Sequence, residues 1–433
     1  MNTLAKQLNE TILAENEHVA AMLSSLGKAI YFPKEGILSQ SAEAKQKATN
    51  FNATIGIATE NKQPMYLDVI QDTLSDYDPK DIYEYAPPAG KPELRTAWKE
   101  KLLRNNPSLV NKSIGNPIVT NALTHGLSIV ADLFADEGDA VILPNKNWEN
   151  YELTFGVRRL AQMVEYPLYN EQNSFNSDGL RQAIFAQQHK GKAIVLLNFP
   201  NNPTGYTPRA EEAKQIVQVL KDAADAGINI VAVTDDAYFG LFYEDSIAES
   251  LFSTLSDIHP RILAIKVDGA TKEEFVWGLR VGFITYASPS TAMLSALEQK
   301  TMGIIRATIS SGPHPSQTFI LRALQSADYE QQKQQKAAIL QRRANKVKYL
   351  LDSGRYGNVL QYYPFNSGYF MCLKFDNISA EAVRTTLLDE YGVGTIALGE
   401  TDLRVAFSCI EEDDLEQLFD YIYEAAKKLA NLT

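Results

Sequence analysis

Two cationic residues in one short stretch could together hold a phosphorylated aldehyde. Lys272 lies just before an expected turn within residues 269–282, and Arg280 follows on the next expected strand. A lysine amine can bond covalently to a carbonyl carbon, and an arginine fork matches the oxygens of a phosphate. A solvated surface lysine and an ordinary surface arginine are the plain alternative, so the pair needs support from other parts of the chain.

A second group of polar residues follows an apolar run. Residues 193–199 form a strand pattern. The segment 198–205, at the end of this strand, is rich in Asn and Pro and ends in Gly. Such residues also make plain turns for backbone reasons alone. Because α/β sheets bind ligands at the ends of parallel strands, Asn202 could donate its side-chain amide to a ligand oxygen there.

A carboxylate ends the next expected strand. Burying a carboxylate at a strand end is costly unless it meets a cation or a strong donor, so Asp235 would face a protonated ring nitrogen or a metal ion. A metal is disfavoured, because the other carboxylate at useful spacing on this element, Asp236, should point the opposite way. A helix or turn cap is the alternative role for Asp235.

Helical and strand patterns alternate through the middle of the chain. Proline 92 is expected to open a helix, a second helix is expected within 121–134, and a third follows Thr207 and ends at Gly227. The apolar runs expected to be strands are 140–143, 193–199, 228–234, 262–267 and 281–286. This alternation predicts an α/β fold with a mostly parallel central sheet covered by helices.

Three regions are predicted along the chain. Residues 1–62 would form an N-terminal arm and part of a small domain, with an apolar-faced helix that needs a partner at 3–26 and an irregular connection at 36–66. Residues 63–327 would form the large domain that carries the groups above. Residues 328–433 would contain a long helix between the lobes and a smaller α+β domain.

The composition limits the classes of protein to which the chain can belong. Of its 433 residues, 45% are hydrophobic and 22% are charged, as in an ordinary soluble globular enzyme. The net charge of −12 argues against binding to nucleic acid or an anionic membrane. Two cysteines and five scattered histidines indicate neither a disulfide framework nor a metal site. Without a signal pattern or a membrane-length apolar run, a cytoplasmic location is expected.

The order of these motifs resembles that of the class I aminotransferases, the aspartate aminotransferase-like branch of the fold-type I pyridoxal-phosphate (PLP) enzymes. Asn-Pro-x-Gly, Asp-x-Ala-Tyr and a lysine followed by Arg-Val-Gly occur in the family's order, and the resemblance covers most of the chain. It implies that the large domain binds PLP and that Lys272 forms a Schiff base with the PLP aldehyde. It also implies that Asp235 pairs with the pyridinium nitrogen, and that Asn202 and Tyr238 bind the phenolic oxygen.

Further cofactor contacts follow from the resemblance. Backbone amides and a hydroxyl of the loop 122–124, before a helix that opens at His125, would hold the phosphate, and a helix N-terminus suits an anion. Arg280 would complete the phosphate site, to which Leu123, Thr124 and Thr271 are also assigned. Trp148 would stack on the cofactor ring, although a plain core position is open for this residue too.

The resemblance also implies a homodimer and a substrate site. Tyr85 matches a tyrosine that reaches the phosphate of the neighbouring subunit, so the active sites would be shared. Arg404 matches the arginine that grips the substrate α-carboxylate as a bidentate fork. Arg306 resembles the arginine that crosses the interface in aspartate-specific members to bind the side-chain carboxylate, and a structural ion pair is equally open for it. Gly56 and Asn202 complete the predicted substrate contacts.

The sequence departs from the family pattern at two positions near the phosphate. Gly269 stands where the family usually has a serine, so one phosphate hydroxyl is missing, and Leu123 stands where a small residue is usual. Neither departure affects Lys272 or Asp235.

The expected activity is amino transfer between an L-amino acid and a 2-oxo acid, in two half-reactions with ping-pong kinetics. Arg306 favours a dicarboxylic substrate such as aspartate, glutamate or 2-oxoglutarate. Because the same cofactor supports β-elimination and decarboxylation, a β-lyase or decarboxylase is the alternative. A non-catalytic PLP-binding regulator is disfavoured, because too few residues precede the matching region for a DNA-binding module. A nicotinamide dehydrogenase is disfavoured because no Gly-x-Gly-x-x-Gly follows an expected strand.

Overall fold

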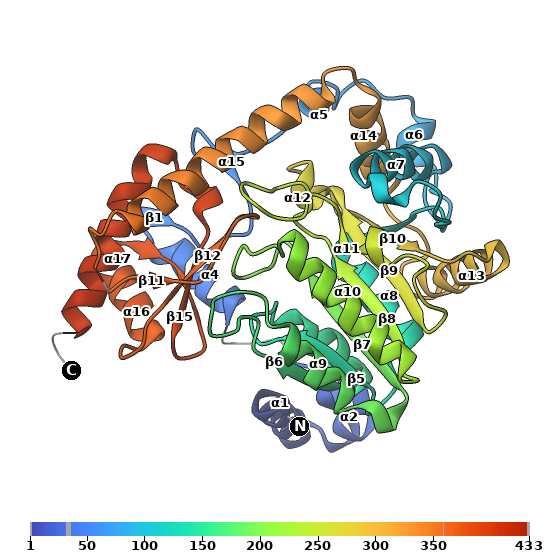
Figure 1. Ribbon diagram of the computed structural model, residues 1–433, viewed down its shortest axis with the longest axis horizontal. Helices are drawn as coiled ribbons and strands as arrows, with labels where there is room; N and C mark the ends of the chain where they lie inside the picture. The colour runs from blue at the N-terminus through green and yellow to red at the C-terminus, as the bar shows by residue number, and fades with distance from the viewer. Residues whose placement is uncertain (1, 32–35, 358, 431–433) are drawn as a thin grey trace.

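A large seven-stranded sheet and a smaller four-stranded sheet organise the chain (Figure 1). The computed structural model describes residues 2–31, 36–357 and 359–430. The strand order of the large sheet is β4-β10-β9-β8-β7-β5-β6. From β6 to β9 all neighbours are parallel, whereas β10 is antiparallel to both β9 and β4. The strands are β4 (Ile118–Asn121), β5 (Ala140–Pro144), β6 (Gln162–Tyr166), β7 (Lys192–Asn198), β8 (Asn229–Asp235), β9 (Ile262–Gly269) and β10 (Val281–Tyr286).

Alternate residues of the central strands face two different hydrophobic cores. One core contains Val141, Ile194, Val231 and Val267, and the other contains Ile142, Val195, Ala232 and Ala264. Helices α8 (Ala122–Phe134) and α13 (Thr291–Thr308) contribute to the first core, and α9 (Ser177–Phe185), α10 (Ala210–Asp225) and α11 (Leu251–Leu255) contribute to the second. Both faces of the sheet are therefore covered, which explains why its strands are continuous apolar runs.

The smaller sheet has the order β11-β12-β15-β14 and is antiparallel throughout. Its strands are β11 (Gln361–Tyr362), β12 (Met371–Lys374), β14 (Ile396–Leu398) and β15 (Asp402–Val405), and α16 (Ala380–Tyr391) and α17 (Leu415–Ala430) belong to the same part of the chain. The short strand β1 (Phe51–Asn52) pairs with β13 (Val393–Gly394), so the N-terminal region reaches this part of the chain. The domain division at residues 62 and 327 stays a prediction.

Helix α15 (Tyr329–Asp352) is the long helix expected at the start of residues 328–433, and it runs between the two sheets (Figure 1). It follows α14 (His314–Gln325), near which α5 (Asp68–Gln71), α6 (Lys80–Tyr83) and α7 (Pro92–Asn105) also lie. At its other end α15 packs against α17. Within it, the buried Arg343 donates to Ser408 O at 2.6 Å, which anchors the helix to the part of the chain that holds the smaller sheet.

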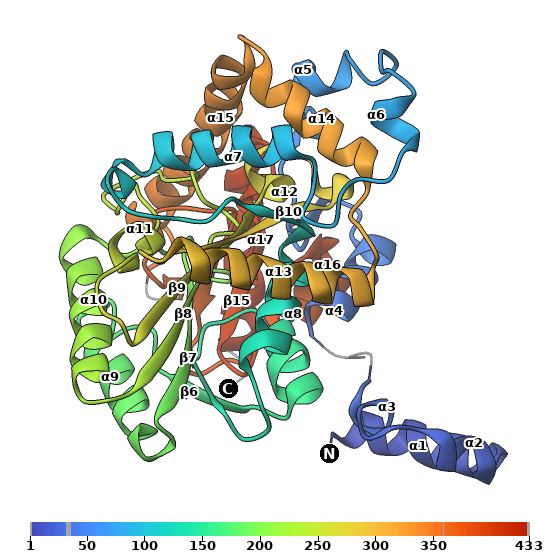
Figure 2. The same ribbon diagram turned by 90° about the vertical axis from the view of Figure 1, so that its right-hand side faces the viewer.

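The N-terminal region departs from the prediction in two places. The single helix expected at 3–26 is wrong, because Asn16 takes an extended conformation that ends the first helix, and two shorter helices follow. Helix α1 (Thr3–Glu15) packs against both α2 (Glu17–Met22) and α3 (Ser25–Ala29), and the three helices lie to one side of the sheets (Figure 2). Leu8, Leu13 and Leu26 are exposed on them, so the partner expected for their apolar face stays a prediction.

The predicted irregular connection at 36–66 is wrong over Ile37–Lys47, which forms helix α4. Its N-cap residue, Gly36, provides no side-chain cap. Instead the carboxylate of Glu149 accepts a hydrogen bond from Ile37 N at 3.1 Å. Because a residue far away in the sequence satisfies the start of this helix, the local sequence carries no start signal. The rest of the segment contains only short strands, among them β2 (Thr59–Glu60) and β3 (Gln63–Pro64).

Candidate active site

A cavity of about 420 Å³ lies at the carboxyl ends of the central parallel strands. Strand β7 ends at Asn198, β8 ends at Asp235, and β9 ends at Gly269, where the single turn α12 (Ala270–Glu273) begins. Since these strands are neighbours in the sheet, residues far apart in sequence meet at one edge. The predicted residues that line the cavity are Gly56, Leu123, Thr124, Trp148, Asn202, Asp235, Tyr238, Thr271, Lys272, Arg280 and Arg404.

Asp235 is a buried carboxylate at the base of this cavity, with 2% of its surface exposed. Its Oδ2 accepts a hydrogen bond from Tyr151 Oη at 2.6 Å, and its Oδ1 accepts one from Ala237 N at 3.2 Å. Burial raises the pKa of Asp235, while the Tyr151 bond and the charge of Lys272 lower it. A carboxylate held in this way is suited to pair with a cation inside the cavity.

Lys272 presents an amine to the same cavity from α12. Its Nζ lies 5.1 Å from the centroid of the Tyr238 ring, and Tyr369 Oη donates to the Lys272 carbonyl oxygen at 2.9 Å. Burial lowers the pKa of Lys272 from 10.5 to about 8, with the charge of Asp235 opposing this change and that of Arg280 adding to it. An amine with this pKa has a useful neutral fraction near neutral pH, as a nucleophile or general base requires.

The pH dependence of aldehyde capture tests this amine directly. In the chain freed of cofactor, capture of pyridoxal phosphate by Lys272 should rise with pH through a midpoint near 8, because only the neutral amine attacks a carbonyl carbon. Absorbance at a series of pH values gives the midpoint, and borohydride reduction followed by peptide mapping locates the modified lysine. A midpoint near 10.5 would contradict the desolvation of Lys272, and Lys272→Arg is the control that should show no capture at this position.

The start of α8 and the turn before Lys272 form a polar corner of the cavity. Thr271 Oγ1 is buried and has no hydrogen-bond partner among the described residues. The N-cap of α8, Asn121, makes no side-chain cap bond, and Arg280 makes a hydrogen bond to Trp277 O at 3.3 Å. An uncapped helix N-terminus, an unpaired hydroxyl and a guanidinium together fit a phosphate group.

The two departures from the family pattern are neighbours in space. A Cβ atom on Gly269 would meet Val281 O at 2.6 Å and Leu123 Cδ1 at 3.1 Å. A serine therefore does not fit at position 269, and the side chain of Leu123 occupies adjacent space. The loop predicted at 122–124, before a helix opening at His125, is wrong. Helix α8 already begins at Ala122, because this residue, with φ of +62°, joins β4 directly to the helix.

Aromatic side chains form much of the cavity wall. The Tyr238 ring is 4% exposed and packs edge-on against Tyr369 and Phe370, with centroids 5.1 and 5.5 Å away. Trp148 packs edge-on against Tyr151 at 5.6 Å. These contacts fix the Tyr238 and Trp148 rings in the cavity wall and leave flat surfaces and a phenol oxygen available to a planar ligand.

Arg404 reaches the cavity from β15 of the smaller sheet and is 2% exposed. Its Nη1 donates to Asn202 Oδ1 at 3.1 Å and its Nη2 donates to Thr54 O at 2.9 Å, while Nε has no partner in the described chain. The guanidinium lies 4.4 Å from the centroid of the Phe370 ring. No described carboxylate forms an ion pair with Arg404, so its buried charge is available to an anionic ligand.

Two predicted residues do not line this cavity. Tyr85 is 93% exposed. Arg306, on α13, is also exposed, and its guanidinium donates to Ser310 Oγ. Gly56, by contrast, does line the cavity, and a Cβ atom on it would lie 3.6 Å from Tyr238 Oη. Within one chain, the structure thus brings together all the predicted site residues except Tyr85 and Arg306.

Among the residues of the site that were not predicted are three aromatic ones. Tyr151 binds Asp235 directly, and Phe370 and Trp277 line the cavity. Tyr151 follows Trp148 at a spacing that places both on one side of a helical turn, and its backbone N–H donates to Trp148 O at 3.0 Å. That spacing could have identified Tyr151 as a site residue, whereas no pattern in the neighbouring sequence identifies Phe370 or Trp277.

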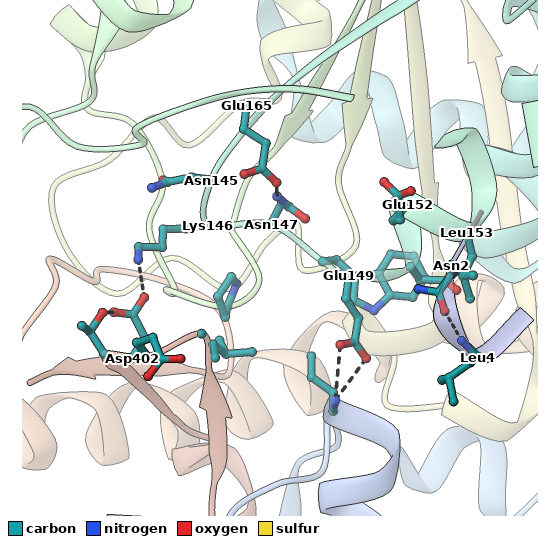
Figure 3. Close-up of a pocket in the computed structure, with 18 of the residues that line it drawn as sticks. Asn2, Leu4, Asn145, Lys146, Asn147, Glu149, Glu152, Leu153, Glu165 and Asp402 are labelled. Carbon is teal, nitrogen blue, oxygen red and sulfur yellow. Dashed lines mark hydrogen bonds and ion pairs between the residues drawn. The ribbon is translucent and has the colours of Figure 1, made fainter. Parts of the chain in front are cut away.

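A wider cavity of about 800 Å³ shares Ile37 and Trp148 with the first. Figure 3 shows the Glu149 carboxylate at the start of α4, where it accepts the hydrogen bond from Ile37 N. It also shows Lys146 paired with Asp402, which opens β15. These two contacts tie the segment that carries Trp148 to α4 and to the smaller sheet.

Two kinds of feature are absent from the described ranges. None of the helices in residues 2–31, 36–357 and 359–430 combines the length and apolar character that crossing a membrane requires. In the same ranges no three His, Cys, Asp or Glu residues are grouped so as to hold a metal ion. Asp236, the carboxylate next to Asp235, binds Ser250 and Lys266 instead, and so points away from Asp235 as expected.

Sequence comparisons point to one family. The family model described as aminotransferase class I and II matches residues 50–422. A probable aspartate/prephenate aminotransferase of Aquifex aeolicus is 30% identical over 229 residues, which cover 51% of this chain and 52% of that protein. The aspartate aminotransferase of Pyrococcus horikoshii is 27% identical over 219 residues, with coverages of 51% and 52%. The chain thus spans about half the length of these curated relatives.

Solved structures match a larger share of the chain than the sequence relatives do. An aminotransferase of Anaerococcus prevotii superposes with a TM-score of 0.82 at 22% identity, covering 92% of this chain and 97% of that one. The aspartate aminotransferase of Thermus thermophilus gives a TM-score of 0.73 at 19% identity, covering 93% and 99%. At these identities the likeness concerns the fold, and it confirms the predicted fold-type I architecture.

Proposed function

The chain belongs to the class I and II aminotransferase family, and from that premise we propose that it is a PLP-dependent aminotransferase acting between an L-amino acid and a 2-oxo acid. One observation carries the proposal: the amine of Lys272, the buried carboxylate of Asp235 and the guanidinium of Arg404, which makes no ion pair with a described residue, meet in one cavity. An aldehyde, a ring nitrogen and a substrate carboxylate are the groups that these three side chains suit.

The residues of the cavity fit PLP. The N-terminus of α8, the hydroxyl of Thr271 and the guanidinium of Arg280 would hold its phosphate, and Asp235 would pair with its ring nitrogen. Tyr238, Asn202 and Trp148 would contact its ring. When bound, PLP supplies an aldehyde for the amino group and a ring that accepts electrons from the substrate Cα.

The chain's own residues account for binding and proton transfer. Arg404 would bind the substrate α-carboxylate, because its guanidinium is buried and lacks an acidic partner in the described chain. Lys272 Nζ would take the proton from the substrate Cα, since its lowered pKa leaves part of the amine neutral. Asp235, held by Tyr151, would keep a positive charge on the ring nitrogen throughout.

A dicarboxylic substrate such as aspartate, glutamate or 2-oxoglutarate is part of the proposal. Among the described residues, the cations that line the cavity are Lys272, Arg280 and Arg404, and each already has a role. A second substrate carboxylate would therefore need a further cation, and we assign that role to Arg306 of the partner subunit in a homodimer. The side chain of Tyr85 is 93% exposed and is therefore free to reach a partner subunit, as such a dimer requires. A cytoplasmic location stays a prediction.

Absorbance spectroscopy of the purified protein with PLP tests both half-reactions. Excess L-aspartate should remove the near-visible absorbance of the Lys272-bound cofactor, and 2-oxoglutarate should then restore it, because the amino group enters and leaves in separate steps. Steady-state rates with both substrates varied should give the parallel lines of ping-pong kinetics.

Other outcomes would change the proposal in defined ways. Formation of ammonia and pyruvate from one amino acid without an oxo acid would indicate the β-lyase alternative. If the absorbance is present and aspartate leaves it unchanged, while an aromatic or aliphatic amino acid removes it, the dicarboxylic preference and the role of Arg306 are wrong. If PLP gives no absorbance with the protein, the proposed activity itself is contradicted.

A further inference from the structure

Two glutamates follow Lys272 directly and are buried among lysines outside the cavity. Glu273 is 3% exposed and Glu274 is fully buried. Lys101 Nζ lies 2.7 Å from Glu273 Oε2 and 2.9 Å from Glu274 Oε1, and Lys333 Nζ lies 2.5 Å from Glu273 Oε1. We call Lys101, Glu273, Glu274 and Lys333 the Lys101 cluster.

The cluster connects α12 and its C-cap residue Glu274 to two long helices. Lys101 belongs to α7 and Lys333 belongs to α15, the helix that runs between the two sheets. From α15, Tyr329 Oη also donates to Glu274 Oε1 at 2.6 Å. Since α12 has only four residues, it has no stability of its own as a helix, and such side-chain contacts fix its position.

The charges of the cluster depend on one another. The Lys101 side chain is 4% exposed, and its Nζ lies 3.9 Å from the centroid of the Trp98 ring. Ions buried to this degree are tolerated only when they are paired. Lys333 Nζ also lies 3.6 Å from Glu274 Oε1, so loss of Lys101 would leave one lysine for two buried glutamates. One glutamate charge would then be uncompensated, and α12 would shift or admit water to relieve it.

We propose that the Lys101 cluster positions Lys272, with Lys101 and Lys333 holding α12 so that the reacting amine stays desolvated in the cavity. Neither lysine lines the cavity, so both act through α12 as positioning residues. The inference rests on the proposed function, because it assigns the cluster a role toward the reacting amine. A cluster that only stabilised the fold would change the melting temperature and leave the titration of Lys272 unchanged.

Lys101→Met in the full-length chain tests the inference through the pH midpoint of pyridoxal phosphate capture by Lys272. A loosened α12 would let water reach the amine, so the midpoint should move from about 8 toward 10.5, by about one pH unit. In the enzyme loaded with PLP, kcat should fall about tenfold with KM little changed, because a misplaced group costs rate more than binding.

Arg104→Met is the matched control. Arg104 Nη2 lies 2.9 Å from Glu330 Oε1, with both side chains 55% exposed, so this pair joins the same two helices without touching α12. The midpoint and kcat of this variant should equal those of the unmodified chain. Lys333→Met should act in the same direction as Lys101→Met, and it decides the matter if Lys101→Met does not fold, because the Lys333 side chain is 17% exposed.

The outcomes separate this inference from the proposed function. If Lys101→Met or Lys333→Met folds and keeps the midpoint near 8 and the normal kcat, the cluster does not position Lys272 and the inference is wrong. If the unmodified chain fails to capture pyridoxal phosphate at Lys272, the proposed function fails first. A raised midpoint in the cluster variants, together with an unchanged Arg104→Met, supports the inference.

Discussion

Lys272→Ala should abolish amino transfer, lowering kcat by about a thousandfold or more, because the variant loses both the covalent attachment and the base that takes the Cα proton. Single-turnover measurements with aspartate report this loss directly. Borohydride reduction in the presence of PLP should then leave no modified peptide that contains position 272.

The fold of Lys272→Ala should remain intact. Burial lowers the pKa of Lys272 to about 8, so below that pH the folded chain holds a charged amine in a place that disfavours charge. This destabilisation is present at pH 7 and is lost as the pH rises from about 8 toward the ordinary value of 10.5. The melting temperature at pH 7 should therefore be unchanged or higher. Lys272→Arg keeps a cation without a neutral amine and should be equally inactive; near-normal turnover in either variant would contradict the assignment of Lys272.

The central strands and the place of the site were predictable because each buried apolar strand is followed directly by a polar side chain of the site. Strands β7 and β8 are covered on both faces, so each is an apolar run that ends abruptly at a polar residue, Asn198 or Asp235. Neighbouring parallel strands end at the same edge, and this rule alone brings Asp235 close to Lys272. The meeting of Asn202, Asp235 and Lys272 follows from that rule, whereas the place of Arg404, on the smaller sheet, was expected only from the resemblance to the family.

Other features depend on tertiary contacts that no local pattern shows. Helix α4 lacks a cap residue of its own and begins where Glu149, 112 residues away, accepts the Ile37 N–H. The absence of a serine at position 269 is explained only when Val281 O and Leu123 are seen beside it.

The sequence also does not show which buried charges form ion pairs. Arg404 and Lys101 are both nearly inaccessible to solvent, at 2% and 3% exposed. Lys101 is neutralised by Glu273 and Glu274, whereas Arg404 makes no ion pair in the described chain. The paired charge of Lys101 holds neighbouring elements together, whereas the charge of Arg404 is available to a ligand. The difference between a structural and a functional cation therefore appears only in the structure.

Asp235→Asn should be the most damaging change after those at Lys272. The substitution keeps the shape of the side chain, and Tyr151 Oη can still donate to its amide oxygen, but the negative charge opposite the ring nitrogen is gone. Removing one preorganised electrostatic partner of the transition state lowers kcat by about a hundredfold to a thousandfold. The charge of Asp235 also raises the pKa of Lys272, so the variant should capture pyridoxal phosphate with a midpoint below 8 in the cofactor-free chain.

A graded comparison separates the charge of Asp235 from its hydrogen bond. Tyr151→Phe leaves the carboxylate and removes the 2.6 Å bond that lowers its pKa, so its effect on kcat should be several times smaller than that of Asp235→Asn. The midpoint of Lys272 should stay near 8 in Tyr151→Phe, because the carboxylate charge is still present. If Tyr151→Phe lowers kcat as much as Asp235→Asn, or if Asp235→Asn raises the Lys272 midpoint, then the carboxylate does not act on the cofactor and the amine through its charge. Asp235 would in that case have the capping role that its position at a strand end also allows.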